Sequence, residues 1–322
     1  MKYRALGDTG ITVSEIGFGA WGIGGETADG PNSYGKTDDG ESRRALMKAF
    51  DLGITFYDTS NLYGYGHSEE LIGETLHSVR QKIVIASKVG FLAHRGPHDF
   101  SEKHVRKSLE GSLKRLHTDY VDLYQLHSPP IKFLEDNPNI LNVFESLQKE
   151  GKIKVFGISV QHPSDALIAI NELGFKSVQV NFNMIDQRVI ENGFLGLAKK
   201  HKTGIIARTP LNFGFLSGKL VNARFDPRDH RSVWSEVQLK RWAEAPRLFS
   251  FLFGGGMTPV QAALNFCLSF PAISSVIPGM LTSAEVEENV AASGMPRFTK
   301  AEIEKARGVY AHNEFFMKNV ES

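Results

Sequence analysis

Eight short β-rich runs alternate with longer amphipathic segments along most of the chain, and this alternation most constrains the fold. The segments between the runs carry apolar residues at helical spacing, and several begin with a Ser, Thr or Asp cap and end at glycine. Eight parallel strands with return helices close into a barrel. We therefore expect an α/β fold, a (β/α)8 TIM barrel, as a single domain over residues 1–322. The runs are SEIGFGA (14–20), TFYDTS (55–60), KIVIASKVG (82–90), YVDLYQLH (120–127), KIKVFGIS (152–159), SVQVNFN (177–183), GIIARTP (204–210) and SSVIPG (274–279).

Two stretches fall outside this alternation. Residues 2–16, KYRALGDTGITVSEI, predict two short strands joined at Asp8-Thr9-Gly10, which form an N-terminal β-hairpin placed to plug the N-terminal mouth of the barrel. A long loop from Asn212 to Met257 separates the seventh strand from its helix. Loops of that length in a compact domain are usually functional or mobile.

Composition excludes several classes of protein. Lys and Arg total 37 against 36 Asp and Glu, so the net charge of +1 gives no broad field to attract nucleic acid or an anionic membrane. The N-terminus mixes charge with glycine, unlike a signal peptide, and no later stretch has the apolar length of a membrane span. A single cysteine, Cys267, excludes an internal disulfide. We expect a soluble cytoplasmic protein, and its oligomeric state is left open.

Three familiar motifs are either absent or lack the surrounding residues that their function requires. Gly17, Gly19 and Gly22 satisfy G-x-G-x-x-G, but a polar glycine-rich loop follows where a Rossmann turn needs a helix. No tyrosine has a lysine four residues later, which excludes short-chain dehydrogenase chemistry. His94 and His98 lack a third ligand, so we predict no metal site.

Polar residues end successive apolar strands. Asp58, Lys88 and His127 each close a strand, and Tyr63 follows shortly after the first of them. Barrel enzymes build their sites at this edge, and a buried acid and lysine cost least when they pair. The sequence therefore predicts a site where these four residues meet.

The motifs that contain these residues resemble the aldo-keto reductase superfamily. They are YDTSNLYGYGHSEELIGETL, IVIASKVG, HTDYVDLYQLHSP and VIPGMLTSAEVEENV, and the resemblance extends from Tyr3 to about Phe298. It implies an NAD(P)H-dependent enzyme that reduces an aldehyde or ketone to an alcohol, or catalyses the reverse. Asp58, Tyr63, Lys88 and His127 match the catalytic tetrad of that family.

The chemistry needs these residue types. A nicotinamide transfers only hydride, so the protein must supply the proton, and the resemblance gives this general acid/base role to Tyr63. We expect the Lys88 cation to lower the pKa of Tyr63. Asp58 would hold the ammonium, and His127 would donate a hydrogen bond to the substrate carbonyl.

Cofactor contacts are also implied by the resemblance. Ser159 and Gln179 match residues that bind the carboxamide, although the asparagine that commonly follows the serine is Val160 here. Arg208 stands where an aromatic residue often stacks on the nicotinamide, and its charge should favour the reduced cofactor over the oxidised one. The full set is Trp21, Asp58, Ser159, Gln179, Arg208, Thr209, Pro210, Leu211, Gly214, Leu216, Ile277, Gly279, Glu285, Glu288 and Asn289.

The resemblance slightly favours NADP(H), and the local charge leaves NAD(H) possible. The stretch that would meet the 2′-phosphate offers no positive charge, and Glu285 would repel a dianion. A basic residue from the long loop would have to reach over, for which Lys219, Arg224 and Arg228 are candidates.

The substrate pocket and the activity leave alternatives open. Trp21, Phe91, Phe213 and Trp234 are candidates for a pocket that takes a small-molecule carbonyl or alcohol, or for packing beneath the long loop. One alternative function is a cofactor-sensing regulatory subunit with little turnover, because the superfamily includes channel-associated subunits. Another is a Schiff-base aldolase that uses Lys88 as its nucleophile.

Overall fold

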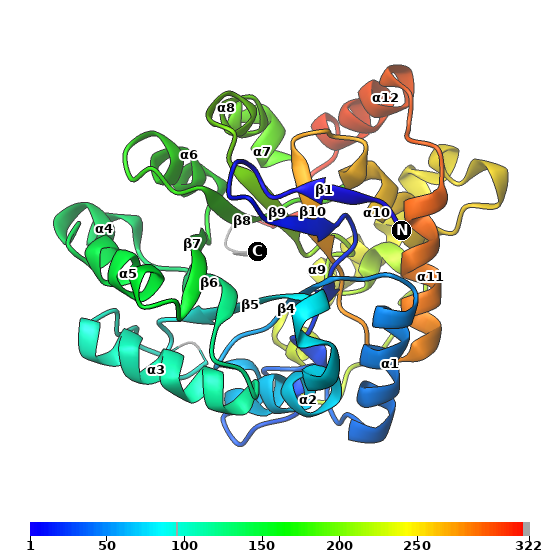
Figure 1. Cartoon of the computed structure of the whole chain (residues 1–322). Helices are drawn as coiled ribbons and strands as arrows, with labels where there is room; N and C mark the ends of the chain where they lie inside the picture. The colour runs from blue at the N-terminus through cyan, green and yellow to red at the C-terminus, as the bar shows by residue number, and fades with distance from the viewer. Residues whose placement is uncertain (95, 318–322) are drawn as a thin grey trace.

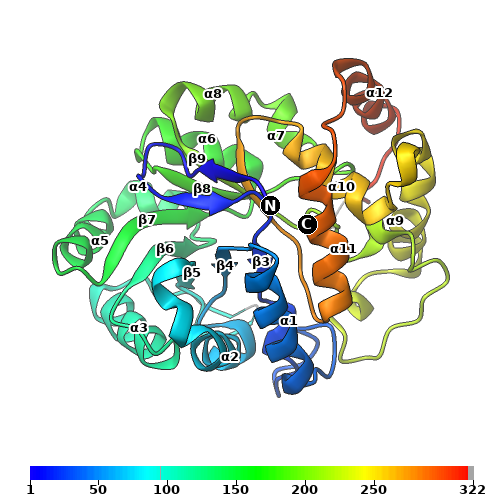
Figure 2. The ribbon, with the colours of Figure 1, turned by 45° about the vertical axis from the view of Figure 1, so that its right-hand side comes forward.

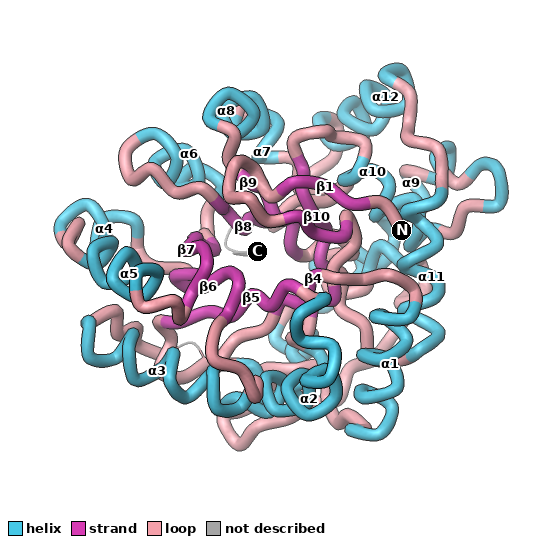
Figure 3. Tube along the Cα trace, in the orientation of Figure 1, coloured by secondary structure: helices cyan, strands magenta, loops and turns pink. Residues whose placement is uncertain are grey.

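The computed structural model describes residues 1–94 and 96–317 and has eight parallel strands in a central ring, surrounded by helices (Figures 1 and 3). The strands are β1 (Tyr3–Ala5), β2 (Thr12–Ser14), β3 (Phe18–Gly19), β4 (Phe56–Asp58), β5 (Val84–Val89), β6 (Val121–His127), β7 (Ile153–Ser159), β8 (Ser177–Asn181), β9 (Gly204–Arg208) and β10 (Ile273–Ile277). The helices are α1 (Asp39–Asp51), α2 (His67–Leu76), α3 (Glu102–Arg115), α4 (Ile131–Asp136), α5 (Ile140–Lys149), α6 (Pro163–Asn171), α7 (Arg188–Glu191), α8 (Phe194–His201), α9 (Glu236–Leu248), α10 (Pro259–Leu268), α11 (Ser283–Gly294) and α12 (Lys300–Ala311).

The ring follows chain order from β3 to β10. Seven of the eight predicted runs contain one of its strands, and the eighth overlaps β10, which begins one residue earlier, at Ile273. The two edge strands meet through the backbone: the N–H of Gly17 donates to the Val276 carbonyl at 2.8 Å, and that of Gly19 to the Pro278 carbonyl at 3.0 Å. This close approach requires glycine, because a Cβ at Gly19 would lie 2.7 Å from the Ile277 carbonyl oxygen. The (β/α)8 barrel is confirmed, and the glycines serve its closure.

The N-terminal hairpin plugs one end of the barrel, as predicted. β1 and β2 pair antiparallel and lie across the ring in Figure 1. Leu6 and Val13 of the hairpin are buried with inward-facing strand residues such as Phe56, Leu123 and Ile206. The hairpin leaves the opposite end of the barrel, where the strands finish, uncovered.

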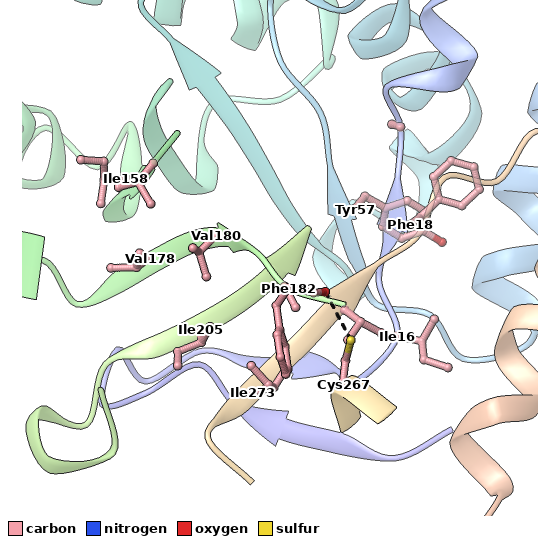
Figure 4. Close-up of a cluster of buried hydrophobic side chains, with 14 of the residues drawn as sticks. Ile16, Phe18, Tyr57, Ile158, Val178, Val180, Phe182, Ile205, Cys267 and Ile273 are labelled. Atoms are coloured by element: carbon pink, nitrogen blue, oxygen red, sulfur yellow. Dashed lines mark hydrogen bonds between the residues drawn. The ribbon is translucent and has the colours of Figure 1, made fainter. Parts of the chain in front are cut away.

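The helices pack their apolar faces on the outside of the ring. Asp38, Ser101, Thr258 and Thr282 cap α1, α3, α10 and α11, in agreement with the predicted caps. Cys267 of α10 is buried in the hydrophobic core between the helices and the ring, and its thiol donates to the Phe182 carbonyl at 3.3 Å (Figure 4). No helix in the described part of the chain is both long and apolar enough to cross a bilayer.

The long connection after β9 contains a helix that the sequence analysis left out. α9 lies between Asn212 and Met257, on the side of the barrel where α11 also runs (Figure 2). Trp242 of α9 is fully buried against Phe213, Phe215 and Trp234 of the same connection. These aromatic contacts hold the parts of the connection together.

Candidate active site

The side chains inside the barrel form an apolar layer with a polar layer above it. Successive residues of a strand point to opposite faces, so residues two apart share a face. Phe56, Ala86 and Leu123 belong to the apolar cluster above the hairpin. Two residues further along the same strands stand Asp58, Lys88 and Gln125, all of them buried. The strand period therefore places an acid, a lysine and an amide together.

Lys88 is the centre of the polar layer. Its Nζ donates to Asp58 Oδ1 at 2.5 Å, to the Thr59 carbonyl at 2.9 Å and to the Tyr63 hydroxyl at 3.1 Å. The side chain is completely buried. Since an ammonium group has three N–H donors, all three have a partner here. The structure thus brings together three of the four predicted catalytic residues.

Asp58 is held by two amides in addition to the lysine. Gln125 Nε2 and Gln179 Nε2 donate to Asp58 Oδ2 at 3.2 Å and 2.7 Å. Gln125 was not predicted, although it lies two residues before His127 on β6 and so shares its face of the strand. Gln179 was predicted to contact cofactor. It lines the cavity and also orients the carboxylate.

The pKa values of Tyr63 and Lys88 are both raised, for different reasons. Burial raises the pKa of the Tyr63 hydroxyl, and the neighbouring Lys88 cation only partly opposes this effect. Burial disfavours the Lys88 ammonium, but Asp58 and Tyr63 outweigh it and raise the pKa of Lys88. Lys88 lowers the pKa of Tyr63 as expected, but burial has the larger effect, so the net pKa lies above the ordinary value. Tyr63 is protonated and Lys88 is charged at neutral pH.

His127 is the fourth member of the predicted tetrad and lies beside Tyr63. Their ring centroids are 6.0 Å apart with the rings nearly perpendicular. Ser60 Oγ lies 3.3 Å from His127 Nδ1, and Phe91 packs edge-on at 4.9 Å. Burial and the nearby Lys88 cation place the pKa of His127 well below its ordinary value, so the ring is neutral at pH 7.

A cavity of about 570 Å³ opens directly over these residues. Asp58, Tyr63 and His127 line one end of it, and Gly279, Glu285 and Asn289 line another part, at the start of α11. Two buried polar atoms of its lining residues, Arg208 Nε and Asn32 Oδ1, have no hydrogen-bond partner among the described residues.

Most of the predicted cofactor residues line this cavity. Ser159 and Leu216 do not: Ser159 is buried behind Gln179, at 3.4 Å between Oγ and Oε1, and Leu216 belongs to the hydrophobic core. Where Val160 replaces the expected asparagine, its carbonyl accepts from Arg208 Nη2 at 3.1 Å. The lining residues from the predicted set are Trp21, Asp58, Gln179, Arg208, Thr209, Pro210, Leu211, Gly214, Ile277, Gly279, Glu285, Glu288 and Asn289.

Two of the four predicted pocket aromatics line the cavity. Trp21 and Phe213 do so. Phe91 instead supports the His127 ring, and Trp234 packs between Phe213 and Trp242, at 4.7 Å and 4.8 Å between ring centroids. For Trp234 the alternative of packing within the long connection is the correct one. The reason is that the connection folds around Trp242, which sequence spacing does not reveal.

Several lining residues come from loops and were not predicted. Asn32 and Tyr34 belong to the loop before α1, and His230 and Arg231 to the connection after β9. The two loops meet where the N–H of His230 donates to the Ser33 carbonyl at 2.7 Å. His94 also lines the cavity, and among the described residues no three His, Cys, Asp or Glu side chains form a metal-binding group.

Comparison with known proteins adds a family and a range of relatives. Residues 15–311 match the model of the Aldo/keto reductase family. The chain is 31% identical to L-galactose dehydrogenase of Arabidopsis thaliana over 94% of this chain and 93% of that protein. It is 28% identical to a probable voltage-gated potassium channel subunit beta of Oryza sativa subsp. japonica, over 96% of each. The holo form of aldo-keto reductase AKR11C1 from Bacillus halodurans superposes with a TM-score of 0.78 at 26% identity, over 99% of this chain and 98% of that one.

Proposed function

Since the chain belongs to the aldo/keto reductase family, we propose that it is a nicotinamide-dependent oxidoreductase that reduces an aldehyde or ketone to an alcohol, or catalyses the reverse reaction. The observation that carries the proposal is the position of Lys88 Nζ, 2.5 Å from Asp58 Oδ1 and 3.1 Å from the Tyr63 hydroxyl. Asp58 and Tyr63 both line the cavity. We also propose that the whole chain forms one barrel domain that works on small molecules in the cytoplasm.

The cavity suits a dinucleotide in an extended form. Its lining includes Thr209, Leu211 and Gly214 between the tetrad and the start of α11, and Arg208 Nε is a buried donor without a partner among the described residues. The bound cofactor supplies hydride in reduction. Its nicotinamide would lie beside Arg208, whose positive charge favours the neutral reduced ring over the cationic oxidised one. The cofactor is NADP(H) or NAD(H), and the residues that discriminate between them lie at the start of α11.

Tyr63 supplies the proton in this mechanism. Its hydroxyl is protonated in the free chain, and in reduction it gives this proton to the substrate oxygen. The Lys88 cation at 3.1 Å stabilises the phenolate that remains, although burial alone disfavours it. Asp58 and the Thr59 carbonyl fix the ammonium, so the stabilising charge does not have to reorganise during the reaction.

His127 orients the carbonyl. Because its pKa lies well below the ordinary value, the ring is neutral and one nitrogen carries a proton. We assign that proton to Nε2, with Nδ1 accepting a hydrogen bond from Ser60 Oγ. The Nε2–H group then donates to the substrate oxygen beside Tyr63. Trp21 and Phe213 provide apolar walls for the rest of the substrate.

A regulatory subunit that senses cofactor is the second candidate, favoured by the similarity to a probable potassium channel beta subunit. The complete tetrad favours the enzyme, because each of its members has the partner that proton transfer needs. The Schiff-base aldolase is disfavoured. All three N–H donors of Lys88 are engaged and the side chain is fully buried, which leaves no neutral amine to attack a carbonyl.

Titration of the protein with NADH and NADPH, followed by turnover with a panel of small aldehydes, tests the proposal. Binding with turnover is the expected result. Binding without turnover on any aldehyde would favour the regulatory subunit, and no binding of either cofactor would overturn the proposal.

A further inference from the structure

The start of α11 is occupied by carboxylates of the chain itself. Glu285 Oε2 accepts hydrogen bonds from the N–H of Leu281 at 2.6 Å and of Thr282 at 3.2 Å. Glu41 of α1 accepts from the N–H of Ser283 at 2.9 Å. Free N–H groups at a helix start are a common phosphate site in proteins. Here these donors already have anionic partners, so an external phosphate would have to displace them.

The cations that line the cavity do not compensate for these carboxylates. In the described part of the chain they are Arg208, Lys219 and Arg231. Arg208 is the last residue of β9 and lies at the end of the cavity that Asp58, Tyr63 and His127 line. Lys219 is bound to Glu288 at 2.9 Å, and Arg231 to Asp229 at 2.7 Å. Each of the two remaining cations therefore already has a carboxylate partner.

The nearby cations that do not line the cavity are also unavailable to a phosphate at the start of α11. Arg44 of α1 is bound to Glu41 itself, at 2.7 Å. Arg228, a candidate from the sequence, is bound to Glu26 at 3.0 Å. Arg224, the other candidate, does not line the cavity. Of the three carboxylates near the start of α11, Glu41 and Glu288 are thus paired with Arg44 and Lys219, whereas Glu285 has no cationic partner among the salt bridges of the described residues.

We propose that the dinucleotide site selects NAD(H) over NADP(H), with Glu285 as the specificity-determining residue; this rests on the proposed function. Tyr63 and Glu285 line the same cavity, so a dinucleotide that spans it would place its adenosine ribose near Glu285. A 2′-hydroxyl there can donate a hydrogen bond to a carboxylate. A 2′-phosphate is a dianion that would meet carboxylates after losing water, and such repulsion is a common source of specificity. This preference is the reverse of the one that the family resemblance favours.

Equilibrium binding tests the proposal without any turnover. Quenching of Trp21 in the cavity reports the Kd values of NADH and NADPH. Adenosine 5′-monophosphate and adenosine 2′,5′-bisphosphate, which differ only by the 2′-phosphate, are then measured as competitors of NADH. We expect the ligand without the 2′-phosphate to bind at least about tenfold more tightly in both pairs.

Two variants separate the effect of Glu285 on cofactor binding from the effect of the overall charge of the helix. Glu285→Gln keeps an oxygen that can accept the N–H bonds of Leu281 and Thr282 but removes the charge. It should lower the NADPH Kd about fivefold or more and change the NADH Kd by less than about twofold. Glu287→Gln makes the same change in net charge on the same helix, at a residue that pairs with Lys48 at 2.6 Å and does not line the cavity. It should leave both Kd values unchanged.

The outcomes are distinguishable. Equal or tighter binding of NADPH by the unmodified chain would overturn the proposal, while aldehyde turnover with NADPH would still uphold the reductase. A similar gain in NADPH affinity in both variants would show an effect of net charge and would overturn the role of Glu285. If neither dinucleotide binds, the proposed function fails together with the inference.

Discussion

Lys88 is the residue on which the proposed chemistry depends, because it is the only cation in direct contact with Tyr63 among the hydrogen bonds of the described residues. It can stay charged in a fully buried position because Asp58 faces it at 2.5 Å and the Thr59 carbonyl takes another of its protons. Removing a partner from such a pair leaves an uncompensated buried charge. Variants at Lys88 or Asp58 would therefore mix effects on folding with effects on catalysis, and Tyr63 is the cleaner test.

Tyr63→Phe removes one hydroxyl and leaves the ring. Because that hydroxyl supplies the proton, we expect kcat for aldehyde reduction to fall by about 100-fold or more, within the usual range for general acid catalysis. The Kd of reduced cofactor should change little, as measured by fluorescence titration. Tyr65→Phe, two residues away at an exposed position, is the matched control and should keep its turnover. Near-normal turnover of Tyr63→Phe would contradict the assignment of the acid.

The pH dependence tests the state of His127. Burial and the Lys88 cation keep the pKa of this histidine well below its ordinary value, and burial keeps that of Tyr63 above its own. Neither group then titrates near neutrality, so kcat/KM for reduction should be flat between about pH 6 and pH 8. Steady-state initial rates at subsaturating aldehyde across that range measure it. An inflection near pH 6.5 that disappears in His127→Gln would show that the ring works as a cation.

At the scale of elements, the strands could be predicted and the loops could not. Most strands carry their own signal, because each is a short, mostly apolar run and several end at a polar residue such as Asp58 or His127. The open end of the barrel is built instead from contacts between distant loops. Trp21 and Trp234 are the same type of residue and both lie in loops, yet Trp21 lines the cavity and Trp234 packs on Trp242. Only the path of the connection after β9 decides between these roles.

The closed end of the barrel depends on Glu15, which follows the hairpin. Its buried carboxylate binds Arg4 at 2.8 Å, Arg297 at 2.5 Å and the Ser293 hydroxyl at 2.7 Å. The hairpin is thereby tied to the segment around α11. Burial alone would raise the pKa of Glu15, but Arg297 and Ser293 bind the carboxylate and bring the net value below the ordinary one.

Glu15→Gln should therefore lower the free energy of unfolding in urea by about 2 kcal/mol at pH 7, less than for a fully enclosed pair because both arginines are partly exposed. A depressed folded pKa stabilises the chain fully above the unfolded pKa, and this stabilisation is lost as the pH falls through the folded pKa. The difference between the two proteins should consequently shrink as the pH falls below about 4. Glu110→Gln, at an exposed pair with Lys152, is the control and should cost less than about 0.5 kcal/mol. A difference that persists unchanged at low pH would point to packing instead of charge.

At the scale of the whole molecule, the connection after β9 bridges the two sides of the cavity. On one side Lys219 binds Glu288 of α11 at 2.9 Å. On the other, Arg228 binds Glu26 at 3.0 Å, and the His230 N–H binds the Ser33 carbonyl at 2.7 Å. Lys219 and Arg228 are more than half exposed, so the ion pairs at this bridge are weak by themselves. A ligand beneath the bridge would add contacts to both sides.

Limited digestion with trypsin measures this effect, because Lys219, Arg224 and Arg228 are cleavage sites on the bridge. Saturating reduced cofactor should slow cleavage there about tenfold or more, since opening of the bridge would then require loss of the ligand. Cleavage at exposed lysines on the outer helices, such as Lys132 of α4, is the internal control and should be unaffected by cofactor. Mass spectrometry of the fragments separates the two sets of sites. Equal rates on the bridge with and without cofactor would mean that the connection takes no part in holding the dinucleotide.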